Sequence, residues 1–423
     1  MIRIPRAGLA RTGVLAAAAL VTACADTPEV LAPPTPAGGA LFTSYVALGN
    51  SITAGYQSSG ISDSTQKESY AYLIATQAMD TPFAVPLLAA PGCPPPVADF
   101  QTQVRGSPPN PDYTGTTCAL RDPASASAVI NNVAVPGATS FDPFASTTAA
   151  SNLLTDLFLG GLSQARRALL ADPTFVSIWI GNNDVLAAGV SGVLTPTAGI
   201  SPGVTPAAAF ADNFNKLVDT LTQNARRLGG GVAIGVVNVT NAPVLFPAAA
   251  LFNPAFRAGF EQFAGGAVTI LPSCTPATTS LLSFQIVSAI RTYRATNGAG
   301  GHPPVIACEK GQFPASPLVG ELFVLDAAEQ EAITATVTAY NAAIQARATA
   351  EGWAYFDPNA ALAQLRATGA IPPVPNLGDP VNPFGIYMSL DGAHPRRPAH
   401  VLVANAVIDA INATYDTALP HVE

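Results

Sequence analysis

The sequence predicts a three-layer α/β/α domain built on a central parallel sheet with long loop insertions. Short apolar runs that end at or near glycines alternate along the chain with long helical stretches. Strands that are apolar on both faces and alternate with helices are typical of a parallel sheet covered on both sides. The 423 residues could form two or three domains of about 150 residues, but one large α/β domain with insertions fits as well.

The predicted strands and helices follow each other in a regular order. Apolar runs predict strands at residues 43–48, 174–180 and 232–239. Helices are predicted over residues 153–170, 207–228, 327–350 and 400–411. We expect the domain to span residues 42–416, with insertions near 81–127, 189–205 and 241–320. Loops of this length are usually functional or cross-linked.

Four cysteines lie in two of these insertions. Cys93 and Cys118 belong to the first insertion, and Cys274 and Cys308 to the third. An even number of cysteines in an exported chain suggests two disulfides, and nearest-neighbour pairing would join the two cysteines of each insertion. Four cysteines allow three pairings, so the connectivity stays open. Neither clustered histidines nor CxxC-like spacing is present, and we expect no metal and no cofactor.

The composition excludes several classes of protein. Only 11% of the residues are charged and 49% are hydrophobic, against roughly 25% charged in an average soluble domain. Intrinsic disorder is excluded because it requires low hydrophobicity and high charge. The formal net charge is −8 and the only lysines are Lys67, Lys216 and Lys310, so no basic stripe is available for phosphates. We therefore expect no nucleic-acid partner.

The N-terminus has the pattern of an export signal. Arginines precede an apolar run over residues 14–21, which is much shorter than the roughly 20 residues that span a bilayer. The sequence Val21-Thr22-Ala23-Cys24 resembles a bacterial lipobox, in which cleavage leaves Cys24 to carry a lipid. The alternative is an ordinary signal peptide with an incidental cysteine. We assign residues 1–24 to the signal.

A short segment separates this signal from the domain. Residues 25–41 are rich in proline, alanine, threonine and glycine without periodicity, which predicts a flexible tether. Ala25, rather than aspartate, follows Cys24, and by resemblance to the enterobacterial sorting rule this favours the outer membrane. We expect an exported protein of the bacterial cell envelope, held to the membrane by its lipid.

A serine stands directly after the first predicted strand. The segment Gly49-Asn50-Ser51-Ile52-Thr53-Ala54-Gly55-Tyr56 places Ser51 on a glycine-flanked turn into a helix. Open α/β sheets bind ligands at the carboxyl ends of their strands, and a helix N-terminus favours developing negative charge. The same pattern also fits an ordinary strand-to-helix cap.

Two further elements carry hydrogen-bond donors suited to an oxyanion. The second strand ends in Gly181-Asn182-Asn183-Asp184, where the amide of Asn183 can donate an N–H. In the segment at residues 131–140, Gly137 follows an apolar run, and a glycine lets the backbone approach a ligand closely. Each element alone is also an ordinary turn sequence.

The C-terminal region supplies a histidine and a carboxylate in Ser389-Leu390-Asp391-Gly392-Ala393-His394-Pro395. A nucleophilic serine needs a base, and that base needs a carboxylate to orient it. Asp391 and His394 are three residues apart, so one turn can hold both side chains. The other histidines lie in a Gly/Pro loop, on the last predicted helix and in the C-terminal tail, at His302, His400 and His421. Position therefore favours His394, although a surface-loop histidine is the alternative.

The four elements occur along the chain in the order Ser51, Gly137, Asn183 and Asp391/His394, and together they resemble the SGNH (GDSL-type) hydrolase family. The resemblance covers about residues 43–412 and implies a flavodoxin-like fold. It implies that Ser51 is the nucleophile, that His394 is the general base and that Asp391 orients this histidine.

The same resemblance implies an oxyanion hole formed by the Ser51 N–H, the Gly137 N–H and the Asn183 side chain. Asn50 stands where the family's name motif has aspartate, a departure that can alter the hydrogen bonding of the turn but leaves these roles in place. The competing α/β-hydrolase fold is disfavoured, because Thr53 stands where its G-x-S-x-G turn has a second glycine.

The reaction implied is the two-step transfer of an acyl group from an ester to water. The ester could be an acyl lipid, a small ester or an acetylated glycan. The apolar stretch from Phe252 to Phe260 either forms a lid or acyl pocket or is a helix packed on the core. The alternatives to an esterase or lipase are a deacetylase or acyltransferase on envelope polysaccharide, and a non-catalytic surface lipoprotein that uses the fold for binding.

Overall fold

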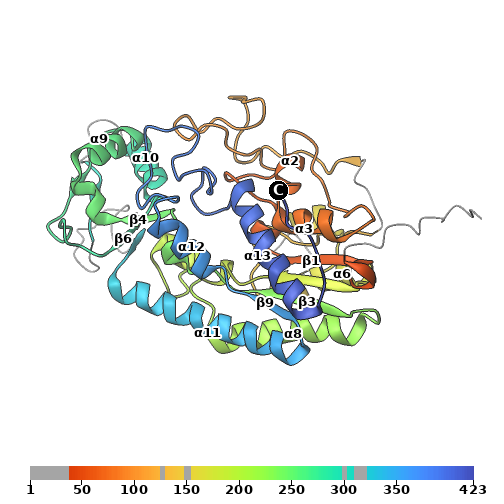
Figure 1. Ribbon diagram of the computed structural model, residues 1–423. Helices are drawn as coiled ribbons and strands as arrows, with labels where there is room; N and C mark the ends of the chain where they lie inside the picture. The colour runs from red at the N-terminus through yellow and green to blue at the C-terminus, as the bar shows by residue number, and fades with distance from the viewer. Residues whose placement is uncertain (1–37, 124–128, 147–153, 298–302, 309–321) are drawn as a thin grey trace, which may run out of the picture. The chain divides into compact units, whose positions relative to one another are not determined.

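The computed structural model describes residues 38–123, 129–146, 154–297, 303–308 and 322–423. A four-stranded parallel sheet, in the order β1-β2-β3-β9, lies at its centre (Figure 1). These strands are β1 (Tyr45–Gly49), β2 (Phe175–Trp179), β3 (Gly230–Ile234) and β9 (Ala354–Phe356). The predicted signal at residues 1–24, with Cys24, and most of the predicted tether lie outside the described residues.

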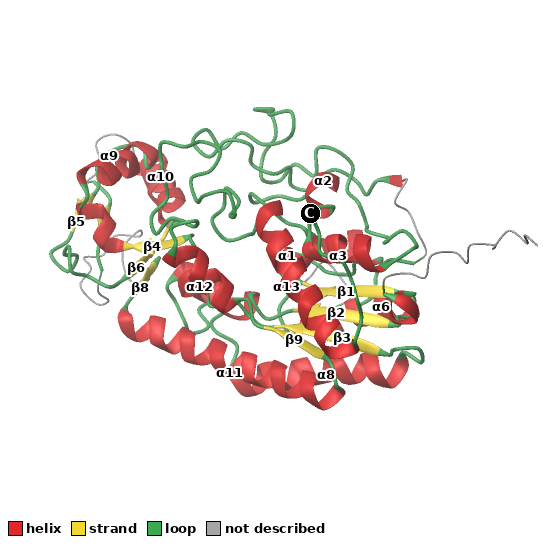
Figure 2. Cartoon of the chain, viewed as in Figure 1, coloured by secondary structure: helices red, strands yellow, loops and turns green. Residues whose placement is uncertain are grey.

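The helices include both short turns and long rods (Figure 2). They are η1 (Gly39–Phe42), α1 (Ser51–Ala54), α2 (Asp63–Gln66), α3 (Tyr70–Ala78), α4 (Asp142–Ala145), α5 (Leu154–Leu159), α6 (Gln164–Leu169), α7 (Asn183–Ser191), α8 (Ala207–Asn224), η3 (Val239–Asn241), η4 (Ala248–Phe252), α9 (Pro254–Phe263), α10 (Ile286–Asn297), α11 (Ala327–Glu351), α12 (Asn359–Ala367) and α13 (Arg397–Tyr415). No helix among the described residues is long and apolar enough to span a membrane.

The spatial order of the segments in the central sheet gives it a flavodoxin-like topology. β1 and β2 pair in parallel, with Tyr45 opposite Phe175. On the other side of β1 runs the extended segment at residues 131–135, where Ala47 N donates to Asn131 O at 2.8 Å and Val133 N donates to Ala47 O at 2.9 Å. This second segment of the chain therefore lies outside the first strand, and β2, β3 and β9 follow on the opposite side. That spatial order is the flavodoxin-like one, and the prediction of a parallel α/β sheet is confirmed.

Helices cover both faces of the sheet because its strands are apolar on both sides. All residues of β1, β2 and β3 are buried. Alternate side chains of these strands point to opposite faces: one set packs with α3 and α13, and the other packs with α8 and α11. Tyr45, Phe175 and Trp179 belong to the first cluster, and Val46, Val176 and Ile178 to the second.

The helix predicted over residues 153–170 is divided in two. Its described part forms α5 and α6, which are separated by Gly160 and Gly161. Both glycines have positive φ, at 61° and 80°, which an α-helix cannot contain. The strand β9 and the extended segment at residues 131–135 were not predicted, because both are too short for a periodic pattern.

The third insertion builds a small layer of its own. β4 (Leu245–Pro247), β6 (Leu281–Ser283) and β8 (Val324–Leu325) form an antiparallel sheet, and β5 (Thr269–Ile270) pairs with β7 (Val305–Ile306). Phe260 on α9 is fully buried and packs near Phe246. The apolar stretch from Phe252 to Phe260 is therefore a helical segment packed on the core of the insertion, which was one of its two predicted alternatives.

Disulfides hold two of the three insertions. Cys93 is bonded to Cys118, and Cys274 is bonded to Cys308. Nearest-neighbour pairing, one of three connectivities that the sequence allowed, is therefore the one observed.

Both ends of the domain extend beyond their predicted limits. Within the predicted tether, residues 39–41 belong to η1, and the next residue, Phe42, is buried against the sheet. At the C-terminus, Leu419 and Val422 are buried, and Val422 N donates to Asn405 Oδ1 at 2.7 Å. The tail after residue 416 is thus docked on α13, because its apolar side chains complete the cluster on that face.

The buried His400 on α13 predicts a loss of stability in mild acid. Its Nδ1 accepts a hydrogen bond from Tyr70 N at 3.1 Å. Burial, with a smaller contribution from the charge of His394, lowers the pKa of His400 from 6.5 to about 3. Below pH 6.5 the unfolded chain binds a proton that the folded chain refuses, so the free energy of unfolding falls by up to about 1.4 kcal/mol per pH unit until the pH reaches about 3.

Urea unfolding at pH 7 and pH 5 measures this effect. We expect His400→Gln, which retains an acceptor for Tyr70 N, to lose less stability than the wild type between these two pH values. His421→Gln is the matched control, because His421 is exposed in an ion pair with Asp409. Equal pH dependence of wild type and His400→Gln would contradict the prediction.

Candidate active site

Ser51 lies where β1 turns into α1. Asn50 caps this short helix, since its Oδ1 accepts a hydrogen bond from Ile52 N at 3.2 Å. A Cβ on Gly49 would overlap Thr53 Oγ1 and the carbonyl oxygen of Trp179, so only glycine fits at the end of β1. The turn therefore presents Ser51 at the carboxyl edge of the sheet, and Asn50 supplies the cap that an aspartate could also provide.

His394 and Asp391 share one tight turn before α13. Ser389 N donates to His394 O at 2.8 Å, and Gly392 N donates to Ser389 O at 2.9 Å. Gly392 has a φ of 68°, in the left-handed region that glycine tolerates without strain. The turn brings the carboxylate of Asp391 beside the imidazole ring of His394, as their spacing predicted.

These three side chains form one chain of hydrogen bonds. Ser51 Oγ lies 2.9 Å from His394 Nε2, and His394 Nδ1 lies 2.9 Å from Asp391 Oδ2. A carboxylate accepts only, so Nδ1 carries the ring proton and Nε2 presents its lone pair to the Ser51 hydroxyl. The ring of Tyr56 packs against the imidazole with centroids 5.0 Å apart. Residues separated by more than 330 positions thus meet in the order that nucleophilic catalysis requires.

The surroundings keep Asp391 ionised. Its Oδ1 accepts hydrogen bonds from Ser389 Oγ, Ala393 N and His394 N, each at 2.9 Å. Its Oδ2 accepts from Ser59 N at 2.8 Å as well as from the imidazole. Burial would raise the pKa of this carboxyl, but the charge of His394 and the hydrogen bonds from His394 and Ser59 outweigh it and hold the pKa well below its usual range.

A strained turn on the other side of the site supports this carboxylate. Ser58 and Ser59 both have positive φ, at 51° and 54°. They join Gln57 to Gly60, which exchange two backbone hydrogen bonds, as in a two-residue hairpin. Positive φ is unfavourable for serine, and Ser389 compensates by accepting from Ser58 N at 2.9 Å. Sequence reasoning missed Ser58 and Ser59, because neither central position of the turn is a glycine or an asparagine.

The element after β2 fixes the predicted oxyanion donors. Asn183 Nδ2 donates to Ala138 O at 2.9 Å. The buried carboxylate of Asp184 accepts from Ser140 N at 2.8 Å and from Ser140 Oγ at 2.7 Å. Burial raises the pKa of Asp184, although the hydrogen bonds from Ser140 oppose it. Both side chains of the motif therefore hold the loop that contains Gly137.

A cavity of about 50 Å³ lies directly over Ser51. Asn183 and His394 line it together with Ser51, and the amide of Asn183 has a second N–H besides the one that it donates to Ala138. Gly137 is not among the described residues that line this cavity. It nevertheless lies two residues after Val135, whose N–H donates to Gly49 O at 3.2 Å, and therefore close to the end of β1.

Two further residues hold the backbone and side chains of the site in place, and neither was predicted to do so. Gln164 on α6 is buried, and its side chain exchanges two hydrogen bonds of 3.0 Å with the backbone of Gly49. Ser389 bridges the strained turn and Asp391, and its place within the quoted C-terminal motif was the available signal. Among the described residues, no group of three or more His, Cys, Asp or Glu side chains is arranged to hold a metal ion.

Comparison with known proteins identifies the family of this chain. The model of the GDSL-like lipase/acylhydrolase family matches residues 45–407. No curated protein sequence matches the chain. Among solved structures, the chain is similar to the extracellular lipase from Streptomyces rimosus, with 16% identity and a TM-score of 0.33, over 88% of this chain and 99% of that chain.

A second similar structure is a mutant of the acetyl-xylooligosaccharide esterase Axe2 from Geobacillus. It has 13% identity and a TM-score of 0.35, over 87% of this chain and 94% of that chain. Similarities this weak carry no argument about substrate, so the assignment rests on the family match. Because that match spans the strands and turns that hold Ser51, Asn183 and His394, the chain belongs to the GDSL-like lipase/acylhydrolase family of ester-bond hydrolases.

Proposed function

We propose that this chain is a serine ester hydrolase in which Ser51 forms an acyl-enzyme. The observation that carries the proposal is the chain of hydrogen bonds from Ser51 Oγ through His394 to Asp391. A serine hydroxyl is a weak nucleophile unless an adjacent base takes its proton during attack. Here the base is already within 2.9 Å of the hydroxyl, and a carboxylate fixes its tautomer.

The reaction has two similar halves. In acylation, a bond forms between Ser51 Oγ and the ester carbonyl carbon while His394 Nε2 takes the hydroxyl proton. The bond to the alcohol oxygen then breaks, and His394 gives that proton to the departing alcohol. In deacylation, water attacks the acyl-enzyme with the same base, and the carboxylic acid leaves with Ser51 restored.

Hydrogen-bond donors stabilise the negative oxygen of both tetrahedral intermediates. We assign this role to the Ser51 N–H, at the start of α1, and to the Asn183 amide, because both residues line the cavity over the nucleophile. The Gly137 N–H is the third proposed donor. Removing one such donor typically lowers kcat by about 10²- to 10³-fold, and Asn183→Ala measures this contribution on any ester that the wild type hydrolyses.

Covalent labelling tests the proposal. We expect a fluorophosphonate probe to modify Ser51, as identified by mass spectrometry of the labelled peptide, and p-nitrophenyl butanoate to be hydrolysed. Ser51→Ala should lose both properties. Ser64→Ala is the matched control, because Ser64 is an exposed serine whose hydroxyl is hydrogen-bonded to Ser62. A folded wild type that neither reacts nor hydrolyses esters would instead support a non-catalytic binding protein.

A further inference from the structure

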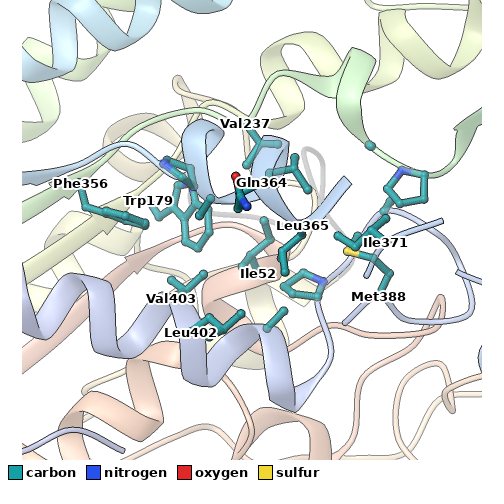
Figure 3. Close-up of a pocket in the computed structure, with 18 residues that line it drawn as sticks. Ile52, Trp179, Val237, Phe356, Gln364, Leu365, Ile371, Met388, Leu402 and Val403 are labelled. Atoms are coloured by element: carbon teal, nitrogen blue, oxygen red, sulfur yellow. The ribbon is translucent and has the colours of Figure 1, made fainter. Parts of the chain in front are cut away.

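A second, larger pocket, drawn in Figure 3, shares lining residues with the cavity over Ser51. It has a volume of about 360 Å³ and lies between the carboxyl ends of the central strands and the helices α12 and α13. Its walls are made of aliphatic, aromatic and proline side chains, and Gln364 and the indole nitrogen of Trp179 are the polar side-chain groups among its described lining residues. A pocket of this composition suits an aliphatic ligand.

The apolar pocket is next to the reacting atoms. Ile52 and Ala393 line both this pocket and the Ser51 cavity, and they are the chain neighbours of Ser51 and His394. Val237 and Ala242 are also shared by the two cavities. The apolar pocket therefore lies beside the position that a substrate carbonyl carbon takes at Ser51.

A third cavity shares Asn183, Leu186 and His394 with the cavity over Ser51, and the chemistry decides which part of the ester each cavity takes. This cavity of about 450 Å³ has a mixed lining, in which Gln103, Arg291 and Asp391 lie among apolar side chains such as those of Phe100, Phe263 and Phe284. His394 must reach the leaving alcohol oxygen to give it a proton. Since His394 lines this mixed cavity and not the apolar pocket, we place the leaving alcohol in the mixed cavity and the acyl chain in the apolar pocket.

Apolar side chains of α12 that line the pocket remain partly exposed to solvent. None of its residues is buried. Leu362 and Leu365 line the pocket from this helix and are only partly buried, and Leu402 on α13 is 45% exposed. An aliphatic chain in the pocket would cover these three leucines, and burying apolar surface is favourable.

We propose that this pocket binds the acyl chain, and that the substrates are esters of medium-chain aliphatic acids and not of acetate. The inference rests on the proposed role of Ser51. The volume of about 360 Å³ lies within the range of roughly 300–1,000 Å³ that ligand pockets have, and it far exceeds the space that an acetyl group needs. Each buried methylene is worth about 0.8 kcal/mol, or roughly fourfold in kcat/KM.

A chain-length series measures the preference. The wild type is assayed with p-nitrophenyl acetate, butanoate, octanoate, dodecanoate and palmitate, below the concentrations at which these esters aggregate. We expect kcat/KM for octanoate or dodecanoate to exceed that for acetate by at least about tenfold, because the longer chains bury several more methylenes.

Two alanines on α12 provide a matched pair of variants. Ala361 and Ala363 are both exposed, but Ala361 lines the pocket and Ala363, 200° around the helix at 3.6 residues per turn, does not. We expect Ala361→Trp to lower the ratio of kcat/KM for octanoate over acetate by about tenfold or more, and Ala363→Trp to keep the wild-type ratio. Leu365→Ala enlarges the pocket and should move the preferred chain toward greater length.

The outcomes separate this inference from the proposed function. Preference of the wild type for acetate, as a deacetylase would show, overturns the acyl-chain proposal while leaving Ser51 as the nucleophile. Equal effects of Ala361→Trp and Ala363→Trp on the ratio also overturn it. If no ester of the series is hydrolysed and Ser51 resists the fluorophosphonate, the proposed function itself fails.

Discussion

Ser51→Ala is expected to lower kcat/KM for p-nitrophenyl esters by roughly 10⁵- to 10⁶-fold, the size of effect seen when a serine hydrolase loses its nucleophile. The fold should survive. Asn50, and not Ser51, supplies the cap of α1, and the Ser51 hydroxyl makes its hydrogen bond to His394. The loss of that bond costs about 1 kcal/mol of stability, which urea unfolding can measure alongside the kinetics.

His394→Ala should be as damaging as Ser51→Ala, and the double variant should be no worse than either. The reason is that a base without a nucleophile, or a nucleophile without its base, performs no proton transfer. His421→Ala is the control for the histidine, since His421 is exposed and paired with Asp409. If the double variant lost the product of the two single losses, Ser51 and His394 would act independently and the proposed relay would be incorrect.

Asp391→Asn is expected to lower kcat by about 10⁴-fold, as the same change does in other catalytic triads. The structure indicates how. Oδ1 of Asp391 accepts three hydrogen bonds from Ser389, Ala393 and His394, so the carbonyl oxygen of asparagine must stay there. The amide nitrogen then replaces Oδ2 and faces Ser59 N and His394 Nδ1.

That exchange of an acceptor for a donor reverses the tautomer of His394. The new amide donates to Nδ1, so the ring proton moves to Nε2, which can no longer accept the proton of Ser51. Asp409→Asn is the matched control, because it makes the same change in the exposed Asp409–His421 pair. Wild-type kcat in Asp391→Asn, with the fold intact by circular dichroism, would refute the orienting role.

Asp391 also contributes to stability, with a defined dependence on pH. Its pKa is held below the unfolded value near 3.9. The stabilising contribution is therefore complete at higher pH and is lost only as the pH falls through the folded pKa. As the pH falls, the free energy of unfolding decreases first because of His400, whose pKa is about 3 in the folded chain and 6.5 in the unfolded chain.

The relative placement of the predicted site residues could be foreseen where it is local in the chain. Asp391 and His394 are three residues apart, so one turn settles their mutual geometry, and the spacing alone revealed it. Ser51 was recognisable because it follows an apolar run and lies on a glycine-flanked turn, a pattern typical of the end of a strand and the start of a helix. Their meeting with Ser51 could be expected only through the resemblance, since more than 330 residues separate the two segments.

Other parts of the site had no local signal. Ser58 and Ser59 adopt positive φ without the residues that usually mark such a turn, because bonds to Ser389 and Asp391 hold them there. Gln164 reads as one polar residue in a helix, yet it is buried against the end of β1. In both cases the partner that makes the residue necessary lies far away in the chain.

The alternation of apolar runs with helical stretches was enough to determine that the strands would be buried on both faces and covered by helices, since burial of apolar surface is favourable. The candidate site residues Ser51, Asp391 and His394 could likewise be identified from their residue types and from short spacings in the sequence. The tertiary structure alone decided where apolar surface stayed open. Ile52, Leu365 and Leu402 line one pocket from three separate segments of the chain. A cavity forms where packed helices and strands leave space between them, so the sequence of a single segment cannot predict it.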